Sequence, residues 1–262
     1  MASLTFGYST LAHRLGKIQL PNLKDHPDWD VLITVQSGNE QLPSAEQLAK
    51  APKGDRIQVL AFPGKGVTKI RNQVLANAKG DYLIFADDDI VFNEEGLLNA
   101  IEFMEDADLA LALGQAVDES GTLRKKYPTQ PQRLNKLNSA KAATYEMLVN
   151  TKLVRDSGVS FDENFGAGAP NTYLGDEYIF VADLVTKGLN CYFIPVTFAT
   201  HPTESSGSGW GTELDRKARA LIFDRVFQGN RTLPYLARIG FGARKIGKGL
   251  TFKSFLLFIF KR

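Results

Sequence analysis

The chain has 262 residues, of which 44% are hydrophobic and 23% charged, a composition typical of a folded globular protein. A single cysteine, Cys191, excludes a disulfide framework within the chain, and no window approaches the roughly 18 apolar residues of a membrane span. The net charge of +2 is unevenly divided: residues 225–262 contain nine Lys or Arg and no acidic residue, whereas the remainder has 22 basic and 29 acidic residues, a net charge of −7.

The N-terminal half alternates strand and helix patterns. Its start has no long apolar core behind basic residues, so it does not resemble a signal peptide. The first strand we expect is the β-branched run at residues 31–35, and the next is at residues 56–62. Apolar residues at helical spacing predict a helix over residues 67–78, and the aliphatic run at residues 82–86 predicts a third strand.

The pattern continues after residue 92. Asn93 is suited to cap a helix that runs to about Met104, and residues 108–117 form another strand pattern. Strands that alternate with helices predict an α/β fold, with a mostly parallel, Rossmann-type sheet covered by helices on both faces. We expect one such domain over residues 1–224 and a basic extension over residues 225–262.

Three consecutive aspartates, Asp87, Asp88 and Asp89, follow the strand at residues 82–86. A solvated turn is the simplest interpretation. However, ligands of open α/β sheets bind beyond the carboxyl ends of the strands, which is where these carboxylates are expected. Acidic side chains two residues apart suit Mg²⁺ or Mn²⁺, which commonly bridges carboxylates to a diphosphate. The triplet therefore predicts a metal and phosphate site.

A phosphatase is an alternative. Asp87 to Val91 also fits the nucleophile motif of haloacid-dehalogenase-type phosphatases. Those enzymes need a second acidic motif, and the only candidate, Asp176 with Asp183, has a longer spacing than that motif requires. Their nucleophile also normally lies on the first strand of the chain, which this is not.

A longer stretch resembles a different family. The run GVTKIRNQVLANAKGDYLIFADDDIVF (residues 66–92) resembles the core of nucleotide-sugar glycosyltransferases with the GT-A fold, especially the inverting family two. The Arg71-Asn72 pair, the Gly80-Asp81 pair and the aspartates occur in the order typical of that family. Residues 147–166 resemble the segment before its acceptor site. Residues 175–188 resemble its acidic helix, and the whole resemblance covers about residues 28–205.

The resemblance implies a GT-A-like fold and a donor site for a nucleotide diphosphate sugar. Asp87 would contact the nucleoside or ribose, Asp88 would assist locally, and Asp89 would coordinate the metal. Arg71 would approach the donor, although a salt bridge on the helix face is its simpler interpretation. The residues that match the nucleoside position at the end of the first expected strand are Val35, Gln36 and Ser37.

The resemblance also implies a catalytic base. The family usually has Glu-Asp at the start of the acidic helix, whereas this chain has Asp176-Glu177. By position Glu177 is the general base and Asp176 holds an acceptor hydroxyl, but the reversed order leaves the two roles open. An exposed acidic helix start, favoured by the helix dipole, is the non-catalytic interpretation. A relative that binds sugar or nucleotide without catalysis is therefore a further alternative.

His201 follows the strand pattern at residues 191–200 and resembles the third metal ligand of many GT-A enzymes. An imidazole suits Mn²⁺ better than Mg²⁺. The Gly- and Ser-rich residues 205–211, with Trp210 among them, resemble a lid that closes over the donor.

The C-terminal extension combines basic residues with the apolar run at residues 255–260. Such a segment can lie at an anionic membrane surface, or it can pack on the domain as a final helix. Nucleic acid is not expected as a partner, because the rest of the chain is acidic and has no recognition motif. We therefore expect a cytoplasmic enzyme at the inner face of the membrane that transfers sugar to a saccharide or lipid-linked saccharide, as in bacterial surface polysaccharide synthesis.

Overall fold

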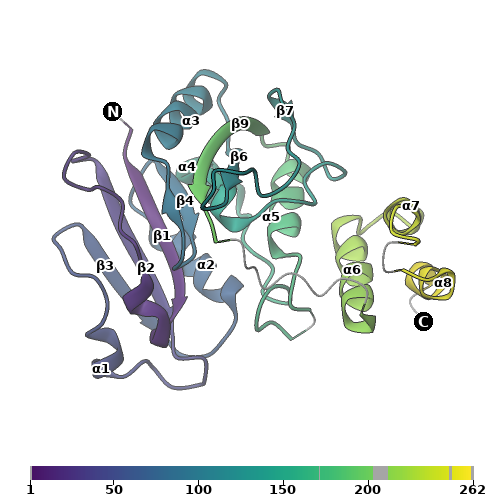
Figure 1. Cartoon of the computed structure of the whole chain (residues 1–262), viewed down its shortest axis with the longest axis horizontal. Helices are drawn as coiled ribbons and strands as arrows, with labels where there is room; N and C mark the ends of the chain where they lie inside the picture. The colour runs from purple at the N-terminus through teal and green to yellow at the C-terminus, as the bar shows by residue number, and fades with distance from the viewer. Residues whose placement is uncertain (1, 171, 203–211, 248–249, 261–262) are drawn as a thin grey trace.

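The computed structural model describes residues 2–170, 172–202, 212–247 and 250–260. A mixed sheet crosses it in the order β3-β2-β1-β4-β8-β6-β9-β5, with β7 paired to β9 (Figure 1). The strands are β1 (Leu4–Leu11), β2 (Trp29–Gln36), β3 (Ile57–Phe62), β4 (Tyr82–Ala86), β5 (Val91–Phe92), β6 (Leu111–Val117), β7 (Gln132–Arg133), β8 (Met147–Asn150) and β9 (Cys191–Thr200).

Helices connect these strands and follow the last of them (Figure 1). The α-helices are α1 (Ala45–Leu48), α2 (Val67–Asn77), α3 (Glu94–Asp106), α4 (Thr151–Ser157), α5 (Asp176–Thr186), α6 (Glu213–Val226), α7 (Leu233–Ala243) and α8 (Phe252–Phe260). Two 3-10 turns are η1 (Ala12–Lys17) and η2 (Thr144–Glu146). Asn93 caps α3 as predicted, since its side chain accepts a hydrogen bond from the Gly96 amide at 3.1 Å.

The strand expected to be first is in fact the second, because β1 precedes it. β1 lies between β2 and β4 and pairs in parallel with both. Gly7 and Ser9 interrupt its apolar pattern, which is why the pattern did not predict it. Gly7 also has a packing role: a Cβ atom there would lie 2.2 Å from the Val74 side chain, so only glycine lets α2 pack this closely on β1.

Alternation along the strands gives the sheet two apolar faces. In β4, Ile84 and Ala86 join one hydrophobic cluster, whereas Leu83 and Phe85 join the other. Side chains of α3 complete the first cluster, and side chains of α2, α4 and α5 complete the second. The predicted arrangement of a mostly parallel sheet with helices on both faces is therefore confirmed.

Strand direction determines where polar groups gather. β1, β2, β3 and β4 are mutually parallel, and β6 and β9 are parallel to each other. β8 lies antiparallel between β4 and β6, so β6 and β9 run in the same direction as β4. The carboxyl ends of β1, β4 and β9 consequently meet at one edge of the sheet.

The last three helices form a group at one end of the molecule. α6 packs on α5 through Ile222 and Val226, and α7 and α8 lie beyond α6 (Figure 1). The domain boundary expected between residues 224 and 225 falls inside α6. Within the described parts of the chain, no helix is long and apolar enough to cross a membrane.

Candidate active site

The three aspartates lie at the carboxyl edge of the sheet, directly after β4, and each has a different environment. Asp88 is buried, whereas the side chains of Asp87 and Asp89 are about one third exposed. Burial raises the pKa of the Asp87 carboxyl, although the nearby Arg71 guanidinium acts in the opposite direction. The triplet thus presents two carboxylates to the edge of the sheet and anchors the third in the protein.

β1 and η1 supply partners that the sequence patterns did not predict. The Thr10 hydroxyl donates a hydrogen bond to Asp88, and Arg14 forms ion pairs with Asp88 and with Asp89, the latter at 3.1 Å. Arg14 therefore offsets part of the repulsion within the triplet. The missing signal was β1 itself, because without that strand nothing in the sequence brings Arg14 to the aspartates.

Arg71 joins the aspartates to the acid pair. Its guanidinium is buried on α2 and forms ion pairs with Asp176, with Glu177 at 3.4 Å and with Asp87 at 3.4 Å. Segments separated by more than 100 residues are thereby connected through one cation. The adjacent Asn72 instead exchanges hydrogen bonds with the Phe161 backbone at 2.8 and 3.0 Å, so it holds the segment after α4 against α2.

The acid pair occupies the first turn of α5. Asp176 is buried, and burial together with the charge of Glu177 raises its pKa to about 8. Burial also opposes ionisation of Glu177. However, Arg71 and a 2.8 Å hydrogen bond from the Thr144 hydroxyl outweigh it, so the pKa of Glu177 is lowered. Glu177 is also the more accessible of the two, which favours it as the group that meets an acceptor.

Backbone packing explains why Asp176 is enclosed. Gly166 has a positive φ of 97°, and a Cβ atom there would lie 2.9 Å from the Asp176 carboxyl carbon. Gly175, which caps α5, has a positive φ of 98° and lies against Ile222 of α6. Two glycines therefore allow the loop and α6 to close around the start of α5.

η2 places two further side chains at the site. The Thr144 hydroxyl donates a hydrogen bond to the Glu177 carboxylate. The Tyr145 ring packs against the His201 ring, with centroids 4.7 Å apart. Tyr145 also lies close enough to Asp87 for that charge to contribute to its raised pKa, whose main cause is burial. Neither residue belongs to a motif, so sequence patterns do not identify them.

The carboxylates and His201 offer few ligands for a metal ion. The described ranges contain no cluster of three or more His, Cys, Asp or Glu side chains that could hold a metal ion. The β5–β9 ladder pairs Val91 with Thr200, which brings the segments of Asp89 and His201 to the same end of the two strands. A divalent cation there would have two protein ligands and would take the rest from phosphate and water, as Mg²⁺ often does.

Three predicted donor residues lie one strand further out. Val35 and Gln36 are buried at the end of β2, where they pair with Thr10 and Leu11 of β1. In the following loop, the Ser37 hydroxyl donates a 2.6 Å hydrogen bond to the Gln41 carbonyl. β1 thus separates these residues from the aspartates, and donor contact by them stays a prediction. The lid predicted at residues 205–211 lies outside the described residues.

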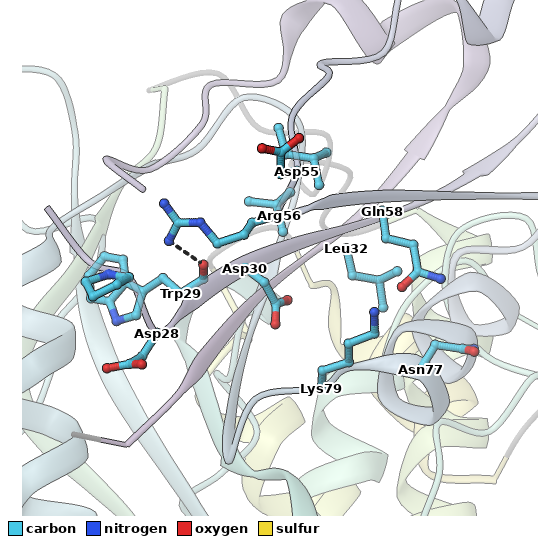
Figure 2. Close-up of a pocket in the computed structure, with 12 residues that line it drawn as sticks. Asp28, Trp29, Asp30, Leu32, Asp55, Arg56, Gln58, Asn77 and Lys79 are labelled. Carbon is cyan, nitrogen blue, oxygen red and sulfur yellow. Dashed lines mark hydrogen bonds between the residues drawn. The ribbon is translucent and has the colours of Figure 1, made fainter. Parts of the chain in front are cut away.

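A cavity of about 380 Å³ lies elsewhere, at the amino ends of β2 and β3. Figure 2 shows its lining, in which Arg56 donates a 3.1 Å hydrogen bond to the Trp29 carbonyl. Asp30 and Lys79 also line it. Because it opens at the edge of the sheet opposite the aspartates, it is separate from the site described above.

Comparison with known proteins agrees with this arrangement. The protein-family model described as glycosyl transferase family 2 matches residues 19–155, which is more than half of the chain. No curated protein sequence matches significantly. Fold and sequence together define a glycosyltransferase of the GT-A type. The chain belongs to glycosyl transferase family 2.

Solved structures of TarS from S. aureus have the same fold. The chain aligns with TarS at 15% identity and a TM-score of 0.57, covering 94% of this chain and 43% of that one. For TarS residues 1–349 the TM-score is 0.59 with 72% of that chain covered, and for the same fragment in complex with UDP-GlcNAc it is 0.57 with 73% covered. This chain therefore spans less than half of the longer TarS chain.

The phosphatase alternative is not supported. Asp183, the second acid that it required, forms a 2.7 Å ion pair with Arg225. The match to glycosyl transferase family 2 assigns the chain to a different class of enzyme.

Proposed function

We propose that this protein transfers a sugar from a nucleotide diphosphate sugar to an acceptor hydroxyl with inversion at the anomeric carbon. The main support for this proposal is the cluster in which Arg71 links Asp87 to the acid pair Asp176-Glu177 at the carboxyl edge of the sheet. The structures of TarS 1–349 with UDP-GlcNAc and with UDP support a uridine nucleotide sugar as the first donor to test.

In the proposed reaction Glu177 accepts the proton of the acceptor hydroxyl. The acceptor oxygen forms a bond to the anomeric carbon while the bond from that carbon to the diphosphate oxygen breaks, and the nucleoside diphosphate leaves with the electron pair. A carboxylate base within hydrogen-bond reach contributes about 10²–10⁴-fold to such a rate. Glu177 is the member of the acid pair whose ionised form is favoured, because the contacts with Arg71 and Thr144 lower its pKa, whereas burial raises the pKa of Asp176.

Positive charge is needed where the diphosphate departs. Arg14 lies beside Asp89, and its side chain is 37% exposed, so it can contact a phosphate oxygen. We propose that Asp89 and His201 hold Mn²⁺ or Mg²⁺ when the donor is bound. The cation would supply further neutralisation of the leaving diphosphate.

We propose a saccharide or lipid-linked saccharide as the acceptor, with a role in bacterial surface polysaccharide synthesis. The test of the function is a panel of nucleotide sugars measured by thermal shift with and without Mn²⁺, followed by detection of donor hydrolysis or transfer. A ligand at one hundred times its dissociation constant adds about 2.7 kcal/mol to the free energy of unfolding. Stabilisation without turnover in any acceptor mixture would favour a non-catalytic binding relative, and no stabilisation by any donor would contradict the proposal.

A further inference from the structure

α7 buries its charged side chain and exposes apolar ones, the opposite of an ordinary surface helix. Its only charged side chain, Arg238, is 1% exposed and points inward, where it forms an ion pair with Asp224 of α6 and a 2.8 Å hydrogen bond to the Ile259 carbonyl of α8. Leu233, Leu236 and Ile239 are exposed instead. A helix on a water-exposed surface normally buries its apolar stripe and exposes its charges.

α8 repeats this arrangement. Phe252, Leu256 and Phe260 follow at intervals of four residues and are exposed, whereas Phe258 and Ile259 are buried. Residues spaced by four lie on one side of a helix, so α8 also exposes an apolar stripe. We call the exposed side chains of α7 and α8 together the apolar stripes; they are Leu233, Leu236, Ile239, Phe252, Leu256 and Phe260.

The stripes are a concentration of apolar surface. Among the described residues, eight of the 17 exposed large hydrophobic side chains lie between residues 233 and 260. Single exposed apolar residues are ordinary, but here they gather on two helices that pack against each other, and such a concentration indicates a surface that meets another apolar phase.

The charged residues near the stripes indicate which apolar phase this surface meets. Arg231, Arg244 and Lys253 are exposed around the stripes, and residues 225–262 contain no Asp or Glu to balance them. Basic side chains beside apolar ones are complementary to the anionic headgroups and acyl chains of a bilayer. α7 and α8 have 11 and nine residues, well short of the roughly 20 that a membrane span requires. They can therefore lie in the interface but not cross it.

We propose that α7 and α8 dock this protein on an anionic membrane surface, with the apolar stripes inserted at the level of the headgroups. α6 connects this pair to the site, because Ile222 of α6 lies against Gly175 at the start of α5. Docking would thus hold the acid pair at a fixed distance from the bilayer. The proposal does not depend on the sugar-transfer reaction, and its test needs no donor or acceptor.

The test is co-sedimentation of the full chain with phosphatidylcholine vesicles that contain or lack phosphatidylglycerol, at low and high salt. We expect binding only to the anionic vesicles, weakened by salt. The variant Leu236→Ser/Phe252→Ser should bind at least about tenfold more weakly, since two large apolar side chains no longer insert. The variant Arg244→Ser/Lys253→Ser should also bind about tenfold more weakly, and it leaves the helix packing untouched.

The matched control is Leu42→Ser/Leu137→Ser, which removes two leucines of similar exposure, 61% and 76%, outside the stripes. It should bind like the original chain. No binding to anionic vesicles at low salt, or equal binding by the original chain and both tail variants, would overturn the proposal. Light scattering that shows a dimer formed through the apolar stripes, together with no binding of that dimer to vesicles, would also overturn the proposal.

Discussion

At the scale of single residues, Arg71 defines the site. A buried cation that contacts three carboxylates holds the aspartate triplet and the acid pair in one network. The loss of one partner from such a network leaves the others unbalanced, so each carboxylate depends on its neighbours.

Glu177→Gln should lower kcat by about 10²–10⁴-fold and leave donor affinity unchanged, because a base acts only on the acceptor. The measurements are steady-state kinetics and nucleotide binding. Asp176→Asn is the comparison. A larger loss of kcat in Asp176→Asn would show that the roles of the two acids are exchanged.

The pH profile of kcat/KM provides an independent test of the same assignment. The pKa of Glu177 is lowered from 4.5. If Glu177 is the base, kcat/KM should therefore stay constant through neutral pH and decrease only when the pH falls below 4.5. The pKa of Asp176 is raised to about 8, so with Asp176 as base the activity should still be rising between pH 7 and pH 8. Circular dichroism at each pH would separate these limbs from unfolding.

Asp89→Ala should abolish both transfer and Mn²⁺-dependent nucleotide binding, while Asp88→Ala should be milder in its metal dependence. The reason is that Asp89 is accessible, whereas Asp88 is buried against Thr10 and Arg14. Isothermal titration with Mn²⁺ and nucleotide checks this. Full activity of Asp89→Ala in a chelator would contradict the proposed metal role.

At the scale of elements, β1 organises the site. It lies between β2 and β4, carries Thr10, and leads into the turn that bears Arg14. Its close contact with α2 also sets the position of the helix that carries Arg71.

Gly7→Ala should therefore destabilise the protein by about 1–3 kcal/mol, because the added methyl group would overlap Val74 and force β1 and α2 apart. Urea unfolding measures the change in free energy. Gly16→Ala is the control, since a Cβ atom there meets nothing within 4 Å. Equal stability of the two variants would show that α2 moves without cost.

At the scale of the whole molecule, the chain combines a sheet domain with a group of three C-terminal helices. α5 and α6 link them through apolar contacts and through the ion pair of Arg225 with Asp183, whereas α6, α7 and α8 are joined to one another around the buried Arg238. α7 and α8 lie on the far side of α6 from the sheet (Figure 1), and residues 225–262 contain nine basic residues and no acidic one.

Arg238→Ala should loosen the three helices, because it removes the ion pair with Asp224 of α6 and the hydrogen bond to the Ile259 carbonyl of α8. The Asp224 side chain is partly exposed, so we expect the loss of these charge-assisted contacts to cost about 1–3 kcal/mol. Hydrogen exchange should show faster exchange in α7 and α8 and unchanged exchange in β1 and β4. Arg244→Ala, at an exposed position, is the control, and uniform acceleration throughout the chain would instead indicate one cooperative unit.

The sequence alone predicted the fold class, most strands and helices, and the carboxylates of the site. Local patterns determine these features: alternation, helical spacing, the Asn93 cap and a run of aspartates after an apolar strand. It could not predict that β1 would lie beside β4, because strand order depends on contacts between distant segments. Arg14, Thr144 and Tyr145 were missed for the same reason. Only the tertiary structure determines which carboxylates form ion pairs with Arg71 and whether the arginine of α7 is buried. Both depend on how distant segments pack against each other.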